Sequence, residues 1–230
     1  MSDSSDHPQR PFVPKRGRRP GHHDAGQQWQ HRWSDEDFAA PWLNRGISAE
    51  IAEAVANAWF PPGAAVLDIG CGEGEVAASM AARGFPSVGI DIAPAAVSRA
   101  RSRFFGVSGR LEFCALDVCD RPPPDRHYPI LIDRGCLHSI QPQDYPRFLE
   151  NLLQVSAPNA RLLLFCRAYR DGFPMGDPEE RRRVTAMVTD GLGGGFHTVR
   201  SADTYLDPFG GQKPDRAMGG VVFWMERRAS

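Results

Sequence analysis

The stretch "VLDIGCGEGEVA", residues 66–77, places an apolar run directly before three closely spaced glycines, Gly70, Gly72 and Gly74. Glycine has no Cβ atom, so it adopts positive φ angles freely and lets a ligand or a neighbouring chain approach the backbone closely. The pattern predicts a buried strand, a tight turn and the start of a helix. Loops of this kind commonly bind nucleotides, but not all bind the same one.

The acidic residues of this loop argue against a dinucleotide. A dinucleotide-binding loop has the form Gly-x-Gly-x-x-Gly and receives a pyrophosphate at the helix N-terminus. Here the sixth position is Glu75, and Glu73 lies inside the loop. Two carboxylates at a helix N-terminus repel a diphosphate and suit a ligand with cationic groups. The sequence therefore argues against a nicotinamide site.

Strands and helices alternate along the chain beyond this loop. Strands are expected at residues 64–69, 87–91, 111–115, 128–133 and 161–166, and helices at 75–83, 94–103, 142–156 and 177–192. Such alternation predicts a parallel sheet covered on both faces. Two further strands, 196–202 and 221–228, are expected to pair antiparallel at one edge. The predicted fold class is α/β, a doubly wound, mostly parallel seven-stranded sheet with an antiparallel edge strand near the C-terminus.

The sequence suggests one folded domain behind a polar tail. Residues 1–27 are rich in Pro, Gly and Arg and are expected to be disordered; the alternative is a basic arm that contacts phosphates. Residues 28–230 form the single domain. It divides into an N-terminal helical cap at 28–62, a cofactor-binding core at 63–166, and a lid with C-terminal strands at 167–230. In the cap, Ser48 is a plausible N-cap for a helix that prolines 61–62 end.

Composition limits the classes of partner and compartment. Lys and Arg number 27 against 28 Asp and Glu, for a formal net charge of −1, so no global basic field indicates a nucleic-acid partner. No run approaches the ~18 apolar residues of a membrane span. The five cysteines lack Cys-x-x-Cys spacing, which makes a disulfide framework or a zinc site unexpected and fits a cytoplasmic protein. Nothing in the sequence indicates an oligomeric state.

Three acidic residues follow three of the predicted strands. Asp68 ends the first strand, Asp91 ends the second about 20 residues after the loop, and Asp117 follows the third. In an open parallel sheet these strand ends line one crevice, where ligands bind. A carboxylate at Asp91 suits ribose hydroxyls, and one at Asp117 suits an adenine amino group. The predicted ligand carries an adenosine and a positive charge but no phosphates.

The segments "VLDIGCGEGEVA", "VGIDIAP" and "CALDV" resemble the first three motifs of the S-adenosylmethionine-dependent methyltransferases with a Rossmann-like sheet. The resemblance runs from about residue 64 to 166 and implies S-adenosyl-L-methionine as the cofactor. It implies that the glycine loop, with Cys71, approaches the methionine part of the cofactor and that Asp68 lies near its amino group. It further implies contacts of Asp91 and Ile92 with the ribose and of Asp117 and Val118 with the adenine.

A narrower resemblance lies on either side of these motifs. "QQWQHRW…APW" and "IDRGCLHSIQPQDYPRFLENL" are similar to segments of the thiopurine and thiol or halide methyltransferases. The similarity implies that Trp29, Trp33 and Trp42 cover the cofactor and acceptor pocket, Trp33 on the cofactor, and that Asp133 and Arg134 border the donor methyl group. The alternative is that the tryptophans pack a core cap.

Two positions depart from the pattern of relatives. Asn159-Ala160 replaces a common Gly-Gly turn before the fifth strand, and Asn accepts the left-handed conformation. Pro129 replaces an acidic residue at the start of the fourth strand.

The expected reaction is methyl transfer to a heteroatom of a small molecule, without a metal. The motifs of amine-modifying nucleic-acid enzymes, of pyrimidine C5 and ribose 2′-oxygen enzymes, and of catechol-type metal sites are all missing. Sulfur is slightly favoured as the acceptor atom, then nitrogen or oxygen of a specialised metabolite, because a thiol is already partly ionised at neutral pH. The alternatives are an RNA or protein methyltransferase that uses the basic tail, and a non-catalytic cofactor-binding module.

Candidate residues for the acceptor side follow the fourth and fifth strands. His138 is the candidate general base, with Asp133 as a second catalytic candidate; a purely structural histidine is the alternative. Arg167, Tyr169 and Phe173 are expected to recognise an anionic or aromatic substrate, unless that segment is only a solvated loop.

Overall fold

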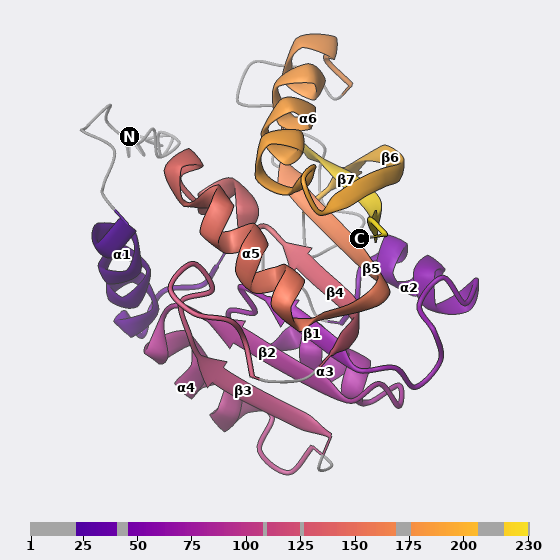
Figure 1. The fold of residues 1–230 in the computed structure, drawn as a ribbon. Helices are drawn as coiled ribbons and strands as arrows, with labels where there is room; N and C mark the ends of the chain where they lie inside the picture. Colours follow the sequence, from indigo (N-terminus) through magenta and orange to yellow (C-terminus); the bar gives the residue numbers. More distant parts are fainter. Residues whose placement is uncertain are drawn as a thin grey trace, which may run out of the picture.

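A seven-stranded sheet organises the protein. The computed structural model describes residues 22–40, 46–107, 110–124, 127–168, 176–206 and 219–229. The strand order is β3-β2-β1-β4-β5-β7-β6 (Figure 1). The first five of these strands pair in parallel, and β7 runs antiparallel to both of its neighbours. The predicted mostly parallel sheet with an antiparallel pair at one edge is confirmed, with β6 as the outermost strand.

The elements follow the predicted alternation closely. The strands are β1 (Val66–Ile69), β2 (Ser87–Asp91), β3 (Leu111–Ala115), β4 (Tyr128–Arg134), β5 (Ser156–Arg167), β6 (Phe196–Tyr205) and β7 (Gly219–Arg227). The α-helices are α1 (His22–Ser34), α2 (Ala49–Ala56), α3 (Glu75–Ala81), α4 (Pro94–Arg103), α5 (Tyr145–Val155) and α6 (Pro178–Leu192). Two short 3₁₀ helices, η1 (Leu137–Ser139) and η2 (Pro142–Asp144), lie between β4 and α5.

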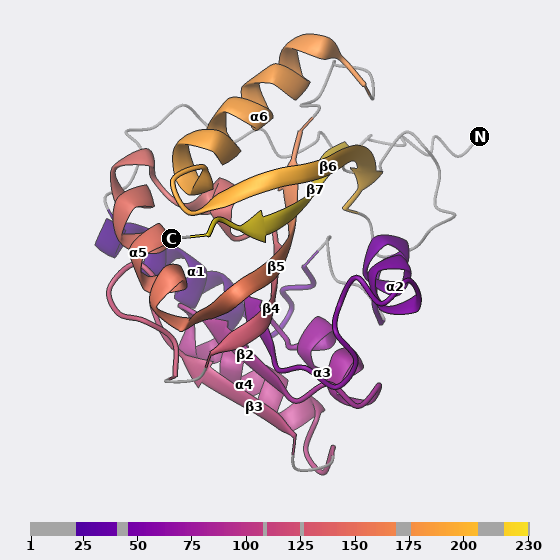
Figure 2. The same cartoon turned by 45° about the vertical axis from the view of Figure 1, so that its right-hand side comes forward.

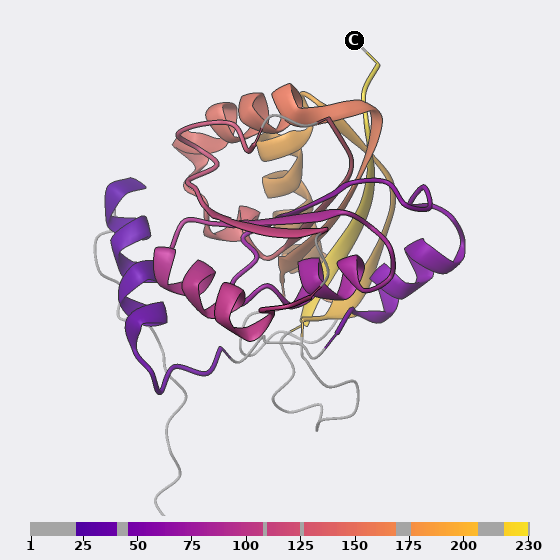
Figure 3. The same cartoon turned by 90° about the horizontal axis from the view of Figure 1, so that it is seen from below.

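Helices cover both faces of the sheet, as Figures 2 and 3 show. Side chains alternate between the faces of a strand, so Leu67 and Ile69 of β1 join one core with α5 and α6, while Val66 joins another with α2 and α3. Leu131 of β4 belongs to the first core and Ile132 to the second. Strands β1 and β4 are therefore buried on both faces, which explains why they appear in the sequence as nearly continuous apolar runs.

Helix α1 packs on the N-terminal half of α4, beside the sheet (Figure 3). The N-cap position of α4 is Ala93, which has no side chain that caps the helix. The Oε1 atom of Gln30 in α1 accepts a hydrogen bond from the Ala95 N–H at 3.0 Å and takes that role. Arg99 of α4 donates to the Phe38 carbonyl at 3.1 Å, which holds the segment after α1. These contacts fix α1 next to the carboxyl ends of β1 and β2.

Two predicted boundaries were wrong. Helix α1 begins at His22, inside the segment 1–27 that was expected to be disordered; residues 1–21 lie outside the described part of the chain. Helix α2 has the expected N-cap, since Ser48 accepts from the Ile51 N–H, but it ends at Ala56, before the prolines. The chain reverses there because Ala58 takes a positive φ of 53° and the Phe60 N–H donates to the Ala54 carbonyl.

This early end of α2 brings the Phe60 ring into the core. Phe60 is fully buried, and burial of such a side chain contributes roughly 1.5–3 kcal/mol. This contribution exceeds the roughly 1–2 kcal/mol that a left-handed alanine costs. The local pattern of apolar residues could not show this balance.

The structure shows how the chain accommodates Asn159 and Pro129. Asn159 adopts the expected left-handed conformation with a φ of 59°, but it lies inside β5, which begins at Ser156 and not at the expected residue 161. Strand β4 starts at Tyr128, and its pairing with β5 shifts register between Tyr128 and Ile130. Pro129 sits in that irregularity, where its missing N–H leaves no ladder hydrogen bond broken.

Asn159 provides a test of backbone strain. We expect Asn159→Ala to lower the free energy of unfolding by about 1 kcal/mol, because alanine carries a Cβ penalty at positive φ. Asn159→Gly should be neutral or slightly stabilising, since glycine adopts this conformation without strain. Urea unfolding followed by far-UV circular dichroism measures both variants. Equal losses in the two variants would instead indicate that the Asn159 side chain itself stabilises the turn.

Candidate functional site

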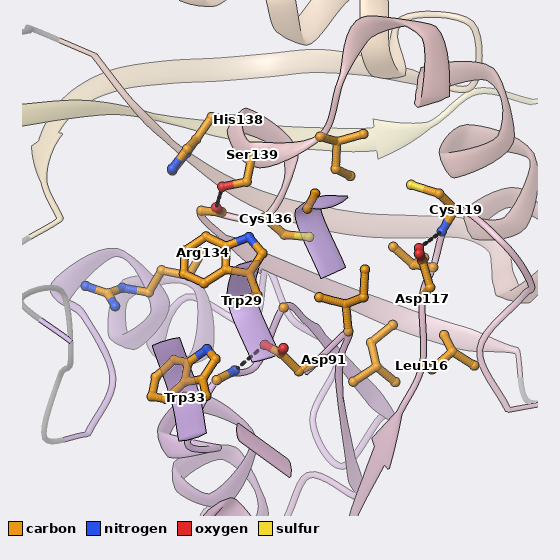
Figure 4. A pocket seen from close by; sticks show the side chains of 18 of the residues that line it. Trp29, Trp33, Asp91, Leu116, Asp117, Cys119, Arg134, Cys136, His138 and Ser139 are labelled. Carbon is orange, nitrogen blue, oxygen red and sulfur yellow. Dashed lines mark hydrogen bonds between the residues drawn. The ribbon is translucent and has the colours of Figure 1, made fainter. Parts of the chain in front are cut away.

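The carboxyl ends of the parallel strands open into a cavity of about 360 Å³ (Figure 4). Its walls come from α1, from the loops after β1, β2, β3 and β4, and from the end of β5. The described lining residues are Ala25, Trp29, Arg32, Trp33, Gly70, Gly72, Ile90, Asp91, Ile92, Leu116, Asp117, Val118, Cys119, Arg134, Gly135, Cys136, His138, Ser139, Ile140, Gln141, Arg167 and Leu206. The site therefore lies where ligands bind in open parallel sheets.

The three glycines of the loop are required by contacts inside the protein. All three have positive φ: 68° at Gly70, 52° at Gly72 and 81° at Gly74. A Cβ atom on Gly70 would lie 2.8 Å from the Cys136 Cβ, and one on Gly74 would lie 2.4 Å from the Phe113 ring. The close approach expected from the sequence is thus made by neighbouring protein. Only Gly70 and Gly72 line the cavity, and Gly74 does not.

Cys71 also faces away from the cavity. Its Sγ packs over β2, since a Cβ atom on Gly89 would lie 3.0 Å from it. The Cys71 N–H donates to the Ile90 carbonyl at 2.8 Å and ties the loop to the end of β2. Burial raises the pKa of the Cys71 thiol well above its ordinary value, so the group stays a neutral packing residue.

The two loop glutamates do not reach the cavity either. Glu73 pairs with Arg99 and Arg103, each at 3.2 Å, and Glu75 pairs with Arg103 at 2.6 Å. Neither is a lining residue. Their charges stabilise the packing of α4 against the start of α3, so the expectation that they select a cationic ligand was wrong in its mechanism.

Two of the three strand-end acids line the cavity. Asp91 accepts hydrogen bonds from the Gly72 and Ala93 N–H groups, both at 2.9 Å, and thereby joins the first two loops. Burial raises the pKa of Asp91 above its ordinary value, and these two hydrogen bonds offset part of that rise. Asp117 accepts from the Cys119 N–H at 2.9 Å (Figure 4). The neighbouring Val118 is held in place because its carbonyl accepts a hydrogen bond from the Asn151 side chain of α5 at 2.8 Å.

Asp68 is held inside the protein. It is 2 % exposed and its Oδ2 accepts from the Ala77 N–H of α3 at 3.1 Å. Burial raises its pKa to about 7. Asp68 lies on the face of β1 opposite to Leu67 and Ile69, which directs it to α3 and not to the cavity.

Asp133 has the same kind of role in the loop after β4. It is 1 % exposed and accepts from the N–H groups of Gly135, Cys136 and Leu137 at 2.9, 2.7 and 3.0 Å. Burial raises its pKa, the three hydrogen bonds offset part of that rise, and the net result is a pKa of about 7. Asp133 is not a lining residue. It shapes the loop that supplies Arg134, Cys136 and His138 to the cavity.

Helix α1 contributes the aromatic wall. Trp29 and Trp33 both line the cavity, and Trp33 is only 3 % exposed. A Cβ atom on Gly72 would lie 3.2 Å from the Trp33 ring, which shows how closely that ring covers the glycine loop. Trp33 also packs with Ala40, Ala93 and Ala96. The two alternatives for these tryptophans are therefore both realised, since they pack a cap and face the cavity; Trp42 lies outside the described residues.

His138 lies at the opposite end of the cavity from Asp117 (Figure 4). Its Nδ1 accepts a hydrogen bond from the Arg167 main-chain N–H at 3.2 Å. Burial, with the nearby charges of Arg167 and Arg183, lowers its pKa to about 4. The ring is therefore neutral at physiological pH. Arg134 lines the same end and donates to the Leu206 carbonyl at 2.8 Å.

Several lining residues were missed by the sequence argument. These residues are Leu116, Cys119, Ile140, Gln141 and Leu206, which reach the cavity because their strands and loops end there. Leu116, Ile140 and Gln141 lie within the quoted segments, but their residue types alone indicate no contact with a ligand. Arg32 could have been found from its position three residues after Trp29 on one helix face; its guanidinium lies 4.9 Å from the Trp29 ring centre. Of the predicted substrate residues, Tyr169 and Phe173 lie outside the described part of the chain.

The described residues contain neither a metal-binding cluster nor a membrane-spanning helix. No group of three or more His, Cys, Asp or Glu side chains is arranged to hold a metal ion in the described ranges. Within the same ranges, no helix combines the length and the apolar character needed to cross a bilayer.

Residues 66–159 match a family model described as a methyltransferase domain. The chain is 30% identical over 133 residues to 2-heptyl-1-hydroxyquinolin-4(1H)-one methyltransferase of Mycobacteroides abscessus, across 54% of this chain and 58% of that protein. It is 26% identical to norajmaline N-methyltransferase of Rauvolfia serpentina, across 55% and 44%. The chain thus spans about half the length of these curated relatives.

The fold is also similar to that of solved structures. The N-methyltransferase NodS of Bradyrhizobium japonicum, in complex with S-adenosyl-L-homocysteine, superposes with a TM-score of 0.60 at 16% identity, over 90% of this chain and 99% of that one. At this identity the likeness is one of fold alone.

The buried carboxylate of Asp133 gives a test of how the loop after β4 is held. Asp133→Asn replaces one acceptor oxygen by an NH₂ group that faces an N–H donor. We expect the free energy of unfolding to fall by roughly 1–3 kcal/mol, the cost of a buried donor left unpaired. Urea unfolding at pH 8, above the pKa of about 7, measures the loss. The exposed Asp120→Asn is the control and should change stability by less than about 0.5 kcal/mol; equal effects of the two changes would contradict the role given to Asp133.

Proposed function

We propose that this chain is a Rossmann-like S-adenosylmethionine-dependent methyltransferase and transfers a methyl group from S-adenosyl-L-methionine to a heteroatom of a small molecule. The observation that carries the proposal is the meeting of Asp91 and Asp117 with the backbone of Gly70 and Gly72 at one cavity. These residues belong to the segment that matches the methyltransferase domain family.

The polar groups that line the cavity fit an adenosine with a charged side chain. Asp91 is available to the ribose hydroxyls, with Ile92 beside it, and Asp117 with Val118 to the adenine. The Gly70–Gly72 backbone and Trp33 border the part of the cavity next to these acids. Asp68, Cys71, Gly74 and Asp133 support this wall from behind and hold its loops in place. The cofactor supplies a sulfonium methyl group, which is already activated toward nucleophiles.

The main task of the protein is then to orient the acceptor and to exclude water. Positioning of two reactants contributes roughly 7–11 kcal/mol to a barrier, whereas a general base adds only about 10²–10⁴-fold in rate. Trp29 and Trp33 close the cavity from the α1 side, and the loop after β4 closes it from the other. We infer sulfur first, then nitrogen or oxygen, as the acceptor atom, because a thiol ionises near neutral pH without assistance.

The size of the cavity supports a small-molecule acceptor. The volume of about 360 Å³, which the cofactor and the acceptor would share, lies at the lower end of the range for small-molecule sites, so an acceptor that enters it must be small. The names of two relatives, 2-heptyl-1-hydroxyquinolin-4(1H)-one methyltransferase and norajmaline N-methyltransferase, point to the same class. Trp29, His138, Arg134 and Arg167 are the described residues that we assign to the acceptor end.

Methyl transfer is tested by incubating the purified chain with methyl-labelled S-adenosylmethionine and a panel of thiols, amines and phenols. Labelled product from at least one acceptor is expected. Absence of cofactor binding by calorimetry would overturn the proposal. Binding without turnover on the whole panel would favour a non-catalytic module.

Asp91 supplies the sharpest test of the cofactor site. We expect Asp91→Ala to weaken binding of S-adenosyl-L-homocysteine by about 1.5–3 kcal/mol, or roughly 10- to 150-fold, through loss of a charged hydrogen-bond partner. Isothermal titration calorimetry measures the change. Asp120→Ala, which alters an exposed acid outside the cavity, should leave the affinity unchanged. Unchanged affinity in a folded Asp91→Ala protein would refute the ribose assignment.

A further inference from the structure

Charge is divided unequally between the two ends of the cavity. Asp91 and Asp117 line the end formed by β2 and β3. Arg134 and Arg167, from the ends of β4 and β5, line the other end together with His138. Figure 4 shows Asp117 on one side of the pocket and Arg134 and His138 on the other. Under the proposed function, the acids belong to the cofactor side, and Arg134 and Arg167 belong to the acceptor side. The third lining arginine, Arg32, comes from α1 and lies over the Trp29 ring.

His138 is not arranged as a general base. The Arg167 main-chain N–H occupies the lone pair of Nδ1, so the proton of the neutral ring resides on Nε2. The Cε1 atom of the His138 ring lies against Gly135, another lining residue. A Cβ atom built on Gly135 would lie 3.0 Å from this Cε1 atom. A ring in this state has an N–H to donate and no free lone pair with which to accept a proton.

The charged groups around His138 keep its ring neutral. Arg167 approaches from β5 and Arg183 from α6, and both disfavour a second positive charge on the ring. Glu180 of α6 is buried and pairs with Arg183 at 3.0 Å, so it compensates the charge of Arg183 only in part. With burial, this environment lowers the pKa of His138 to about 4.

The other described groups at this end are also poor bases. Burial and the nearby Asp133 raise the pKa of the Cys136 thiol well above its ordinary value, so it remains protonated. Asp133 lies behind the loop and both of its oxygens accept backbone N–H groups. Among the described lining residues of the acceptor end, none therefore offers an unprotonated atom with a free, basic lone pair: the one lone pair of neutral His138 is occupied, and the Cys136 thiol keeps its proton.

We propose that the acceptor binds as an anion, that Arg134 and Arg167 attract its charge, and that His138 donates a hydrogen bond to it from Nε2. The proposal rests on the proposed function and narrows its substrate class to acidic nucleophiles, such as thiols, phenols or N-hydroxy groups of aromatic rings. The acceptor loses its proton to water before it binds.

The bond changes then need no further proton transfer. The electron pair of the acceptor anion forms the new bond to the methyl carbon, and the pair of the broken carbon–sulfur bond remains on sulfur. Anion and sulfonium become two neutral products. Because the negative charge of the acceptor diminishes in the transition state, Arg134 and Arg167 stabilise mainly the bound acceptor. Their removal should raise KM more than it lowers kcat.

The charge preference is tested with two probes of similar shape. Protein saturated with S-adenosyl-L-homocysteine is titrated with 4-nitrophenolate, at a pH where the phenol is ionised, and with uncharged 4-nitroanisole. We expect at least tenfold tighter binding of the anion. Arg167→Gln should remove most of this preference while keeping the main-chain N–H that contacts His138. Arg147→Gln, which changes an exposed arginine outside the cavity, should leave it intact.

Equal affinity for the two probes, or no binding of the anion at millimolar concentration, would overturn the proposal. Normal binding of S-adenosyl-L-homocysteine in the same protein would show that the proposed function survives that failure. The histidine is examined separately by ¹⁵N NMR of histidine-labelled protein, with the His138 signals assigned by their loss in His138→Gln. A neutral Nε2–H ring from pH 8 to below pH 5 is expected. Titration between pH 6 and 7, or an Nδ1–H tautomer, would refute the donor role.

Discussion

The cavity depends on hydrogen bonds from loop N–H groups to buried carboxylates at the ends of adjacent parallel strands. Asp68 of β1 accepts from the start of α3, Asp91 of β2 joins the glycine loop to the start of α4, and Asp133 of β4 accepts from three successive N–H groups. A strand that ends in a loop leaves its N–H groups without ladder partners, and burial makes an unpaired donor costly. The carboxylates satisfy these donors and fix the loops in space.

The same arrangement separates the side chains that hold the loops in place from those that line the cavity. The side chains of Asp68 and Asp133 lie behind the cavity wall, whereas Asp91 and Asp117 reach its surface. The glycines divide likewise, because Gly70 and Gly72 line the cavity while Gly74 makes room for Phe113. The site thus consists of a thin layer of groups that line the cavity and a second layer that holds their backbone. Changes in the second layer should appear first as lost stability and only then as lost affinity.

Much of the fold could be predicted because its local signals agree. The boundaries of β2 and β3 follow from apolar runs in the sequence, and the start of α4 follows from a proline suited to the first helical turn. The prediction was wrong where long-range packing outweighed local preference. Phe60 enters the core and ends α2 early, and Gln30 caps α4 from a segment that looked disordered in part. Gln30 is 65 residues from Ala95, and the core that receives Phe60 includes Ile130 and Leu163 from much later strands.

The sequence by itself determined the order of strands and helices, the glycine loop and the acids at the strand ends, since these depend on residue type and spacing within one or two elements. It therefore also indicated the class of cofactor. Only the tertiary structure decided which of these acids face the cavity, which glycines serve internal packing, and that His138 shares its end of the cavity with Arg134 and Arg167. Those properties depend on contacts between β4, β5 and α6, and distances between separate elements are set by the packing of the whole core.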